Sequence, residues 1–339
     1  NLGTGTSSNS LFLGNYTFAG AVYNIKVWTT LPNGVTDQNN LNDTLNFVFS
    51  YPPLGGNYPI GSTTGMFTSP QQAICYLKWV GMSSPVIANI EPGVYNQQLH
   101  IPAIAGSSPT NTLTIQSSTQ NANDVTFQYS ALDSTNNYVI CMDSLQYINV
   151  NHLTIEALGN DFAKVIDLRG NSSNINFNNN ILRSKDILRS SAEDFAIVLL
   201  GGAHSNISFD DNRFEDGHLG LLKTNNLIAY DLIIKNNTFN DQLLGNIHLE
   251  TTNGTVIQKN RMMTISTDDN FKSIFLSDAK NQFDILQNTF DLNDGIGINI
   301  INSQINSSNF GLVANNMIAL NSTSTATGID FDNVFLLED

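Results

Sequence analysis

The residues best suited to acid–base chemistry lie in one short stretch, from Asp210 to His218. Two adjacent carboxyl groups, Asp210 and Asp211, begin it, and a Gly-His pair ends it. Hydrolysis of a glycosidic bond needs two carboxyl groups on one face, one as proton donor and one as base or nucleophile. Asp210, Asp211 and His218 are therefore the candidate catalytic set. The alternative is that the two aspartates are solvated turn residues with no catalytic role.

A second stretch that could bind a ligand is the long insertion 183–194. It contains the basic residues Arg183, Lys185 and Arg189, and acidic residues follow closely at Glu193 and Asp194. Insertions in repeat proteins map to one face of the molecule, which is often the binding face. This segment is either a binding loop or a plain insertion.

Oxygen-rich turns could hold a calcium ion. Asp37, Asn39 and Asp43 lie in one such turn, and residues 291–295 form another. Neither has the spacing of an EF-hand loop, so each is either a calcium site or ordinary turn chemistry. None of the five His residues has a second His two or four residues away, which argues against zinc. No other cofactor is expected.

The two cysteines, Cys75 and Cys141, match no metal-binding or redox motif. They are either two free thiols or one disulfide, and their spacing does not decide between these alternatives. The formal net charge of −15 argues against nucleic acid and against an anionic membrane surface as partners. No apolar run approaches the roughly 20 residues that a membrane-spanning helix needs, so membrane insertion is not expected.

A repeated phrase organises the chain from about residue 148 onward. Its pattern is apolar, any, apolar, two polar residues, Asn, any, apolar, as in Ile175, Phe177, Asn180 and Leu182. The Asn positions are Asn180, Asn212, Asn237, Asn260, Asn288 and Asn315. They account for part of an unusual total of 48 Asn in 339 residues, a density that needs a structural reason.

A second short apolar strand precedes each copy by about ten residues, so each repeat contains at least two strands and an Asn turn. A repeat of this length cannot bury its own inner face, but stacked repeats bury it continuously. The leucine-rich framework is absent, and a propeller blade needs about 40 residues. The pattern predicts an all-β fold, a parallel β-helix solenoid of about ten coils.

The repeated Asn follows a strand where the chain must bend. Asn tolerates the left-handed conformation and bonds to neighbouring backbone groups, and stacked Asn side chains can form a ladder. We expect the six Asn side chains to be buried or half-buried in such a ladder. The alternative is a line of Asn side chains that binds a ligand.

The segment 68–81 is predicted to be a helix that covers the first coil. Ser69 is its N-cap, Pro70 occupies the first turn, and Gly81 follows its end. Such a cap protects the open core of a solenoid. We therefore assign residues 58–339 to the β-helix, with 68–81 as its capping helix.

Residues 1–57 lack the Asn repeat. Alternating apolar residues around Gly20, a Pro32-Asn33-Gly34 turn and the strand 45–49 resemble the end of an immunoglobulin-like adhesion domain. That fold needs about 100 residues, so the resemblance implies only its last strands, a partial β-sandwich that ends in a linker. The chain is accordingly expected to be part of a larger protein.

Several motifs carry a resemblance to a family. The runs from Phe67 to Pro70, from Asn89 to Leu99 and from Asn151 to Ala157 resemble right-handed parallel β-helix, pectin-lyase-like modules of large secreted surface proteins of Bacteroidota. The resemblance covers about residues 58–335. It implies a secreted or cell-surface location, with other domains or subunits of the parent protein as partners.

The Asp210-Asp211 and Gly217-His218 pairs are also similar to part of the polygalacturonase pattern. That family carries Asn-Thr-Asp one coil earlier and Arg-x-Lys on a later coil, whereas this chain has Asn178-Asn179-Asn180 and Lys235-Asn236-Asn237. These departures remove required groups. The main prediction is therefore a non-enzymatic, adhesin-like or fibre-forming surface module. The alternative is a polysaccharide-active, lyase- or glycosidase-like or glycan-binding β-helix.

Overall fold

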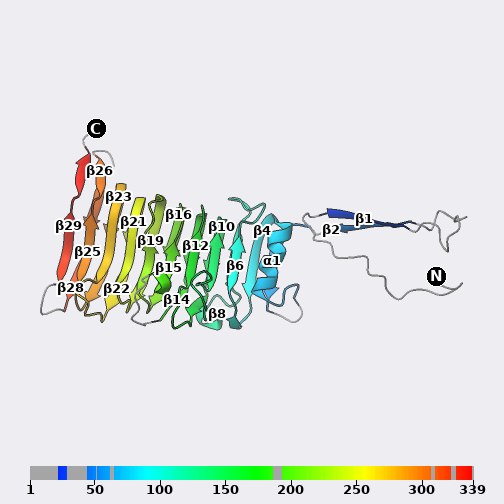
Figure 1. Ribbon diagram of the computed structural model, residues 1–339, viewed down its shortest axis with the longest axis horizontal. Helices are drawn as coiled ribbons and strands as arrows, with labels where there is room; N and C mark the ends of the chain where they lie inside the picture. The colour runs from blue at the N-terminus through cyan, green and yellow to red at the C-terminus, as the bar shows by residue number, and fades with distance from the viewer. Residues whose placement is uncertain are drawn as a thin grey trace, which may run out of the picture.

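The computed structural model describes residues 22–28, 44–50, 52–61, 65–185, 193–306, 310–321 and 326–337. Strand makes up 58% and helix 6% of the chain, which winds into a right-handed parallel β-solenoid of about nine turns. Figure 1 shows the successive coils stacked side by side along a rod, with the helix α1 (Pro70–Val80) at one end. The predicted fold is confirmed, with about nine turns in place of ten.

Each coil contributes a strand to each of three faces, which the chain visits in the same order every time. The first face holds β3 (Leu54–Ile60), β4 (Met82–Ile90), β7 (Leu113–Ser117), β10 (Gln146–Asn151), β13 (Ser173–Asn178), β16 (Ser205–Asp210), β19 (Ala229–Lys235), the later parts of β21 (Gly245–Gln258) and β23 (Lys272–Leu286), and β27 (Gly311–Ala314). The strands β26 (Gln304–Asn306) and β30 (Phe335–Leu337) pair with each other next to it.

The second face holds β5 (Gly93–Asn96), β8 (Val125–Tyr129), β11 (Thr154–Ala157), β14 (Ile181–Arg183), β17 (Arg213–Glu215), β20 (Thr238–Asn240), β22 (Arg261–Thr264), β24 (Thr289–Leu292) and β28 (Met317–Leu320). The third face holds β6 (Leu99–Pro102), β9 (Ile140–Asp143), β12 (Ile166–Arg169), β15 (Ala196–Leu200), β18 (Leu219–Lys223), the early parts of β21 and β23, β25 (Ile296–Ile301) and β29 (Thr327–Asp332). Because β21 and β23 run around a corner unbroken, the first and third faces join into one sheet.

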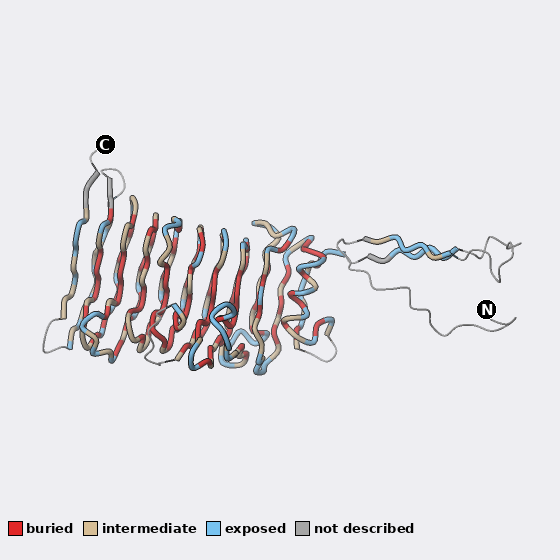
Figure 2. Tube along the Cα trace, viewed as in Figure 1, coloured by how far each residue is buried: buried red, intermediate tan, exposed pale blue. Residues whose placement is uncertain are grey.

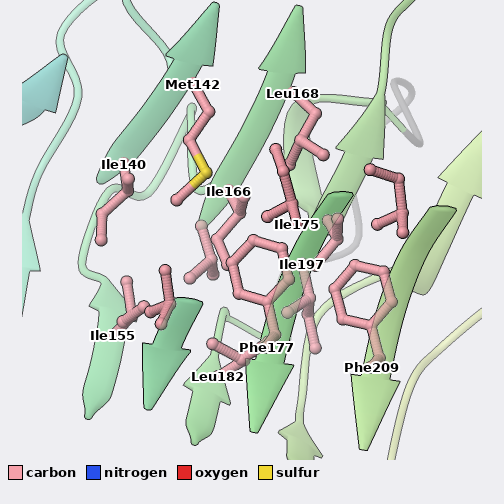
Figure 3. Close-up of a cluster of buried hydrophobic side chains, with 14 of the residues drawn as sticks. Ile140, Met142, Ile155, Ile166, Leu168, Ile175, Phe177, Leu182, Ile197 and Phe209 are labelled. Atoms are coloured by element: carbon pink, nitrogen blue, oxygen red, sulfur yellow. The ribbon is translucent and has the colours of Figure 1, made fainter. Parts of the chain in front are cut away.

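The register places equivalent residues of successive coils above one another. Ile175 of β13 pairs with Ile148 of β10 and Ile207 of β16, and all three point inward. The Phe177 and Phe209 rings stack with their centroids 4.9 Å apart (Figure 3). Such a ring pair adds about 0.5–1.5 kcal/mol beyond the area that it buries. In Figure 2, buried residues recur along the strands of most coils, between residues that are partly or fully exposed.

The helix α1 closes the N-terminal end of this interior. The Ser69 hydroxyl accepts a hydrogen bond from the Gln72 main-chain N–H (3.2 Å), and Gly81 follows the last turn with φ of 71°. Ala73, Ile74 and Leu77 are buried against the first coils, as expected for a helix that covers them. Without the helix, the inner side chains of β4 and β6 would be exposed at an open end.

The N-terminal region contains an antiparallel pair, β1 (Val22–Trp28) with β2 (Thr44–Ser50). The following strand β3 begins at Leu54 and pairs in parallel with β4, so the solenoid begins before the domain boundary predicted between residues 57 and 58. The Gly55-Gly56 pair, which the sequence indicated to be a linker, lies inside this strand. An immunoglobulin-like origin for residues 1–57 stays a prediction. Among the described residues, no helix has the length and apolar character to cross a membrane.

Candidate functional site

The three residues of the candidate catalytic set do not form one site. Asp210 ends β16 on the first face, where its Oδ1 accepts a hydrogen bond from Nδ2 of Asn236 (2.7 Å). Asp211 occupies the next turn, with φ of 53°. His218 lies at the opposite end of β17 and is buried, its ring stacked on Phe195 with centroids 4.7 Å apart. The strand β17 separates the carboxyl pair from the imidazole. Their closeness in the sequence therefore does not bring them together in space.

The predicted Asn turn is a buried ladder of side chains between the first and second faces. Asn237 is 1% exposed, and its Oδ1 accepts from both the main-chain N (2.9 Å) and Nδ2 (3.0 Å) of Asn212. Its own Nδ2 also donates to the Phe209 carbonyl oxygen (2.9 Å). The same contacts continue through Asn180, Asn212, Asn237, Asn260 and Asn288. All of these donors and acceptors are satisfied within the protein.

The last rung of the ladder is Asn316, so the assignment of Asn315 to it is wrong. Oδ1 of Asn316 accepts from the main-chain N (2.9 Å) and Nδ2 (3.0 Å) of Asn288. The reason is the register of β27, in which Val313 pairs with Ile285. The predicted phrase used Leu312 instead and was therefore one residue early.

The left-handed residue of each turn is the one before the ladder Asn, and not the ladder Asn itself. Its φ lies between 53° and 58° at Asn179, Asp211, Asn236, Lys259, Gln287 and Asn315, and His152 has the same conformation before Leu153, which takes the place of the Asn. A left-handed residue turns the chain sharply, which directs the next side chain into the rod. Asp211 therefore has a conformational role, because Asp and Asn tolerate this region better than most residues.

The structure offers no described metal site. The predicted calcium turn at Asp37, Asn39 and Asp43 lies outside the described residues. Within the described part of the chain, no three His, Cys, Asp or Glu side chains converge as metal ligands. Both cysteines are free thiols, Cys75 exposed on α1 and Cys141 buried on β9.

Part of the long insertion belongs to a strand. Arg183 ends β14 on the outer side of the second face, where it forms ion pairs with Glu215 of the next coil (2.6 Å) and Glu156 of the previous coil (3.6 Å). Arg213 pairs with the same Glu215 carboxylate. These charges satisfy one another along the face. Residues 186–192 of the predicted binding loop lie outside the described residues.

A different charged cluster lies on the outer side of the third face, on β9 and β12. Parallel pairing places Asp167 next to Cys141 and Arg169 next to Asp143. Alternate residues of a strand share a face, so these four side chains lie on the same outer surface. The corner loops 130–139 and 158–165 precede these strands, and they contribute Tyr138 and Lys164 to the cluster.

Asp167 is the central group of this cluster, and its side chain is only 5% exposed. Its Oδ2 accepts a hydrogen bond from Nε of Arg169 (2.9 Å) and forms an ion pair with Nη2 of the same side chain (2.8 Å). Nζ of Lys164 lies 3.7 Å from the same oxygen. The Arg169 guanidinium is 40% exposed and lies over the Tyr138 ring, 5.4 Å from its centroid. One carboxylate oxygen is thus fixed by two cations, and one of these cations reaches solvent.

The Cys141 thiol lies among these charges. Burial raises its pKa to about 12, with Arg169, Asp167, Asp143 and Lys164 as charged neighbours. A protonated, buried thiol is a weak nucleophile. Cys141 therefore separates the charged side chains as a neutral packing group.

Asp143 and Asp167 form a pair of carboxyl groups on neighbouring strands. Asp167 lies opposite Cys141, so Asp143, two residues further along β9, is its diagonal neighbour. With parallel strands about 4.8 Å apart and a rise of about 3.3 Å per residue, the Cα atoms of such diagonal neighbours lie about 8 Å apart. The two carboxyl groups that flank a glycosidic bond in glycosidases lie about 5–9.5 Å apart. The backbone spacing of the two residues therefore lies within this range.

This pair was missed in the sequence because its members are 24 residues apart, one full coil. Asp167 interrupts the apolar strand Ile166-Asp167-Leu168, and Asp143 follows Met142 in the same way. The available signal was an outward-facing acidic residue in each of two successive third-face strands, offset by two positions in the register. The conspicuous carboxyl pair in the sequence is instead the adjacent pair Asp210-Asp211.

No family model matches this chain, and no curated protein matches it significantly. Among solved structures, the rice weevil pectin methyl esterase aligns over 84% of this chain and 91% of its own, with 10% identity and a TM-score of 0.40. The GH136 lacto-N-biosidase from Eubacterium ramulus covers 83% and 68%, with 9% identity and a TM-score of 0.41. The Streptococcus pneumoniae surface protein and adhesin PfbA covers 76% and 88%, with 12% identity and a TM-score of 0.27. At these values, the likenesses carry no conclusion about activity.

Proposed function

We propose that this β-helix is a polysaccharide-active protein and that its third face, at β9 and β12, is the site of glycosidic-bond hydrolysis. The observation that carries the proposal is the diagonal pair of carboxyl groups, Asp143 and Asp167, together with Arg169, which lies beside Asp143 in the register and forms an ion pair with Asp167. The catalytic set predicted from the sequence does not come together in this way, because β17 separates Asp210 and Asp211 from His218.

The proposed roles follow from the surroundings of each carboxyl group. Asp167 is oriented by Arg169 and Lys164, which suits a carboxylate that attacks the anomeric carbon or activates water. Asp143 lies nearer the surface, and its Oδ1 accepts a hydrogen bond from the Ser144 hydroxyl (2.9 Å). It is the proposed acid, which donates its proton to the glycosidic oxygen as the bond to carbon breaks.

The exposed part of Arg169 has a binding role in this proposal. Its Nη2 also donates to the Thr135 carbonyl oxygen (3.1 Å), and its face lies over Tyr138. These contacts hold the guanidinium rigidly next to the carboxyl pair. It is therefore preorganised to orient sugar hydroxyl groups above Asp167.

The experiment measures reducing ends released from a panel of neutral and charged polysaccharides, together with retardation of the protein in gels that contain them. We expect the wild type to release reducing ends from at least one polymer. D143N and D167N should lower kcat by at least 100-fold, because removing a catalytic acid or base has effects of about 10²–10⁴. D284N, on the first face, should match the wild type.

Melting temperatures separate loss of catalysis from loss of folding, since D167N also removes a partner from two cations. D143N is the safer variant because Asp143 is only partly buried. Wild-type activity in both variants would overturn the proposal. So would a wild type that neither cleaves nor binds any polymer in the panel.

A non-enzymatic, adhesin-like or fibre-forming surface module is the second candidate function. The observation that favours it is the uniform rod, with one strand per face in nearly every coil and a continuous Asn ladder. A secreted or cell-surface location, an origin in Bacteroidota and a larger multidomain parent are parts of this same prediction. Binding of a polymer without release of reducing ends would favour this candidate over the enzyme.

A further inference from the structure

The outer row of the third face that contains Asp143 and Arg169 has a gap at the next coil. Asp143 pairs with Arg169, and Gly201, directly after β15, occupies the equivalent place in the following coil. Its main-chain N–H donates to the Leu168 carbonyl oxygen (2.8 Å), which holds it in register. Thr224 continues the row one coil further. Along this row, the Asp143 carboxylate is followed by the Arg169 guanidinium, then by no side chain at Gly201, and then by the Thr224 hydroxyl.

Backbone conformation does not require glycine at this position. Gly201 has no left-handed φ, and a Cβ built on it would lie 3.2 Å from the Leu168 carbonyl oxygen. Its neighbour Gly202 is different, because a Cβ there would lie 1.7 Å from the Gly170 carbonyl oxygen. Close packing explains Gly202. Gly201 is exposed and leaves a gap in the outer row, and an added Cβ would need only a small shift, a few tenths of an ångström, from the Leu168 carbonyl oxygen.

The gap borders the carboxyl group of Asp167. A Cβ on Gly201 would lie 3.9 Å from Oδ1 of Asp167, whereas Arg169 and Lys164 both form their ion pairs with the other oxygen, Oδ2. On the other side, the Thr224 hydroxyl donates to Oε1 of Glu193 (3.0 Å). The gap is thus bounded by a cation at one end and a hydroxyl–carboxylate pair at the other.

We propose that the surface above Gly201 is the subsite for the sugar ring next to the bond that is cleaved, and that Gly201 sets the size of the group accepted there. This inference rests on the proposed function of the Asp143–Asp167 pair. Neighbouring strands are about 4.8 Å apart. A polysaccharide that lies along the rod axis would therefore place about one sugar ring over each strand. Gly201 lets that ring approach the backbone, and an added side chain would occupy its place.

The test compares G201A and G201L with S277L. Ser277 lies in the same outer row, three coils beyond Gly201, and the strand register places it next to Glu250. For the polymer that the wild type cleaves, G201A should raise KM a few-fold and G201L at least 10-fold. Melting temperatures should stay close to that of the wild type, and S277L should leave KM unchanged.

The outcomes distinguish this inference from the proposed function. If D143N and D167N lose activity while G201L keeps the wild-type KM, the Gly201 subsite is wrong and the catalytic pair stands. If D143N and D167N keep activity, the catalytic pair is wrong, and with it the inference. If G201L lowers the melting temperature, G201A decides the test. An unchanged KM in G201A would then overturn the subsite.

Discussion

Asn237 accepts two hydrogen bonds on one side-chain oxygen, from the main-chain N and the Nδ2 of Asn212, one coil earlier. Its own N and Nδ2 donate in the same way to Oδ1 of Asn260, at 2.9 and 3.0 Å. A substitution in the middle of this chain of bonds thus affects groups on two neighbouring coils.

Asn237→Ala should lower the free energy of unfolding by about 1–3 kcal/mol, because the Asn212 donors lose a buried acceptor. Asn237→Asp should also destabilise, since a carboxylate cannot donate to the Phe209 carbonyl oxygen that Nδ2 now contacts. Urea unfolding measures both. The control is Asn171→Ala, at an exposed turn position outside the left-handed region. Equal stabilities of the Asn237 and Asn171 variants would contradict an energetic role for the ladder.

The left-handed turn residue next to the ladder makes a separate prediction. Asn236 has φ of 55°, so Asn236→Ala should cost about 1 kcal/mol or more in backbone strain. Asn236→Gly should be close to neutral, because glycine adopts this region freely. Both variants lose the same contact with Asp210, so their difference in thermal unfolding isolates the strain. A stability of the Ala variant equal to or above that of the Gly variant would be inconsistent with this assignment.

Lys223 occupies an inward position in the third face, where the register places Leu249 beside it, and it is 0% exposed. Its Nζ donates to the carbonyl oxygen (2.8 Å) and Oδ1 (3.0 Å) of Asn225. Burial lowers its pKa from 10.5 to about 8. The folded state therefore holds a charge at an energetic cost at pH 7, a cost that falls as pH rises from about 8 to 10.5.

Lys223→Met should remove that cost and raise the free energy of unfolding at pH 7 by roughly 1–3 kcal/mol, after the lost bonds to Asn225 are subtracted. The advantage of the variant over the wild type should shrink at pH 10. Denaturant unfolding at the two pH values measures this difference. A variant that is less stable than the wild type at pH 7 would show that the bonds to Asn225 outweigh the buried charge.

His204 is a second buried base, whose Nε2 accepts a hydrogen bond from the Gly202 main-chain N–H (3.0 Å). Burial, with repulsion from Lys223, lowers its pKa from 6.5 to about 4, while Asp167 acts weakly in the opposite direction. Protonation would turn the acceptor nitrogen into a donor. Because the unfolded state binds the proton more readily, His204 reduces stability progressively as pH falls from 6.5 to about 4.

His204→Gln keeps a neutral acceptor near Gly202 but cannot take up a proton in this range. The stability that the wild type loses between pH 7 and pH 4 should exceed the loss in the variant by roughly 2–3 kcal/mol. Chemical unfolding at both pH values gives the comparison. Identical pH dependence in the two proteins would show that His204 does not contribute to acid sensitivity.

Much of the architecture was predictable because repetition makes local signals add up. The alternation of Ile175 and Phe177, the Asn that follows them and the capping signals at Ser69 and Gly81 each indicate one local structure. A short repeat that cannot bury its own core must stack on its neighbours, so the solenoid followed from the period alone. The error at Asn315 arose where the last copy is weakest and two adjacent asparagines offer two registers.

The candidate site was not predictable in this way. Asp143 and Asp167 are unremarkable in their own segments and become neighbours only through the register of β9 and β12. The adjacent pair Asp210-Asp211 looked more suited to chemistry, but its turn geometry directs it away from His218. Local sequence thus determined the strands, the turns and the rod, because their causes lie within a few residues. Only the tertiary structure decided which charges meet, because a shift of one residue in strand pairing moves a side chain from the outer surface to the core.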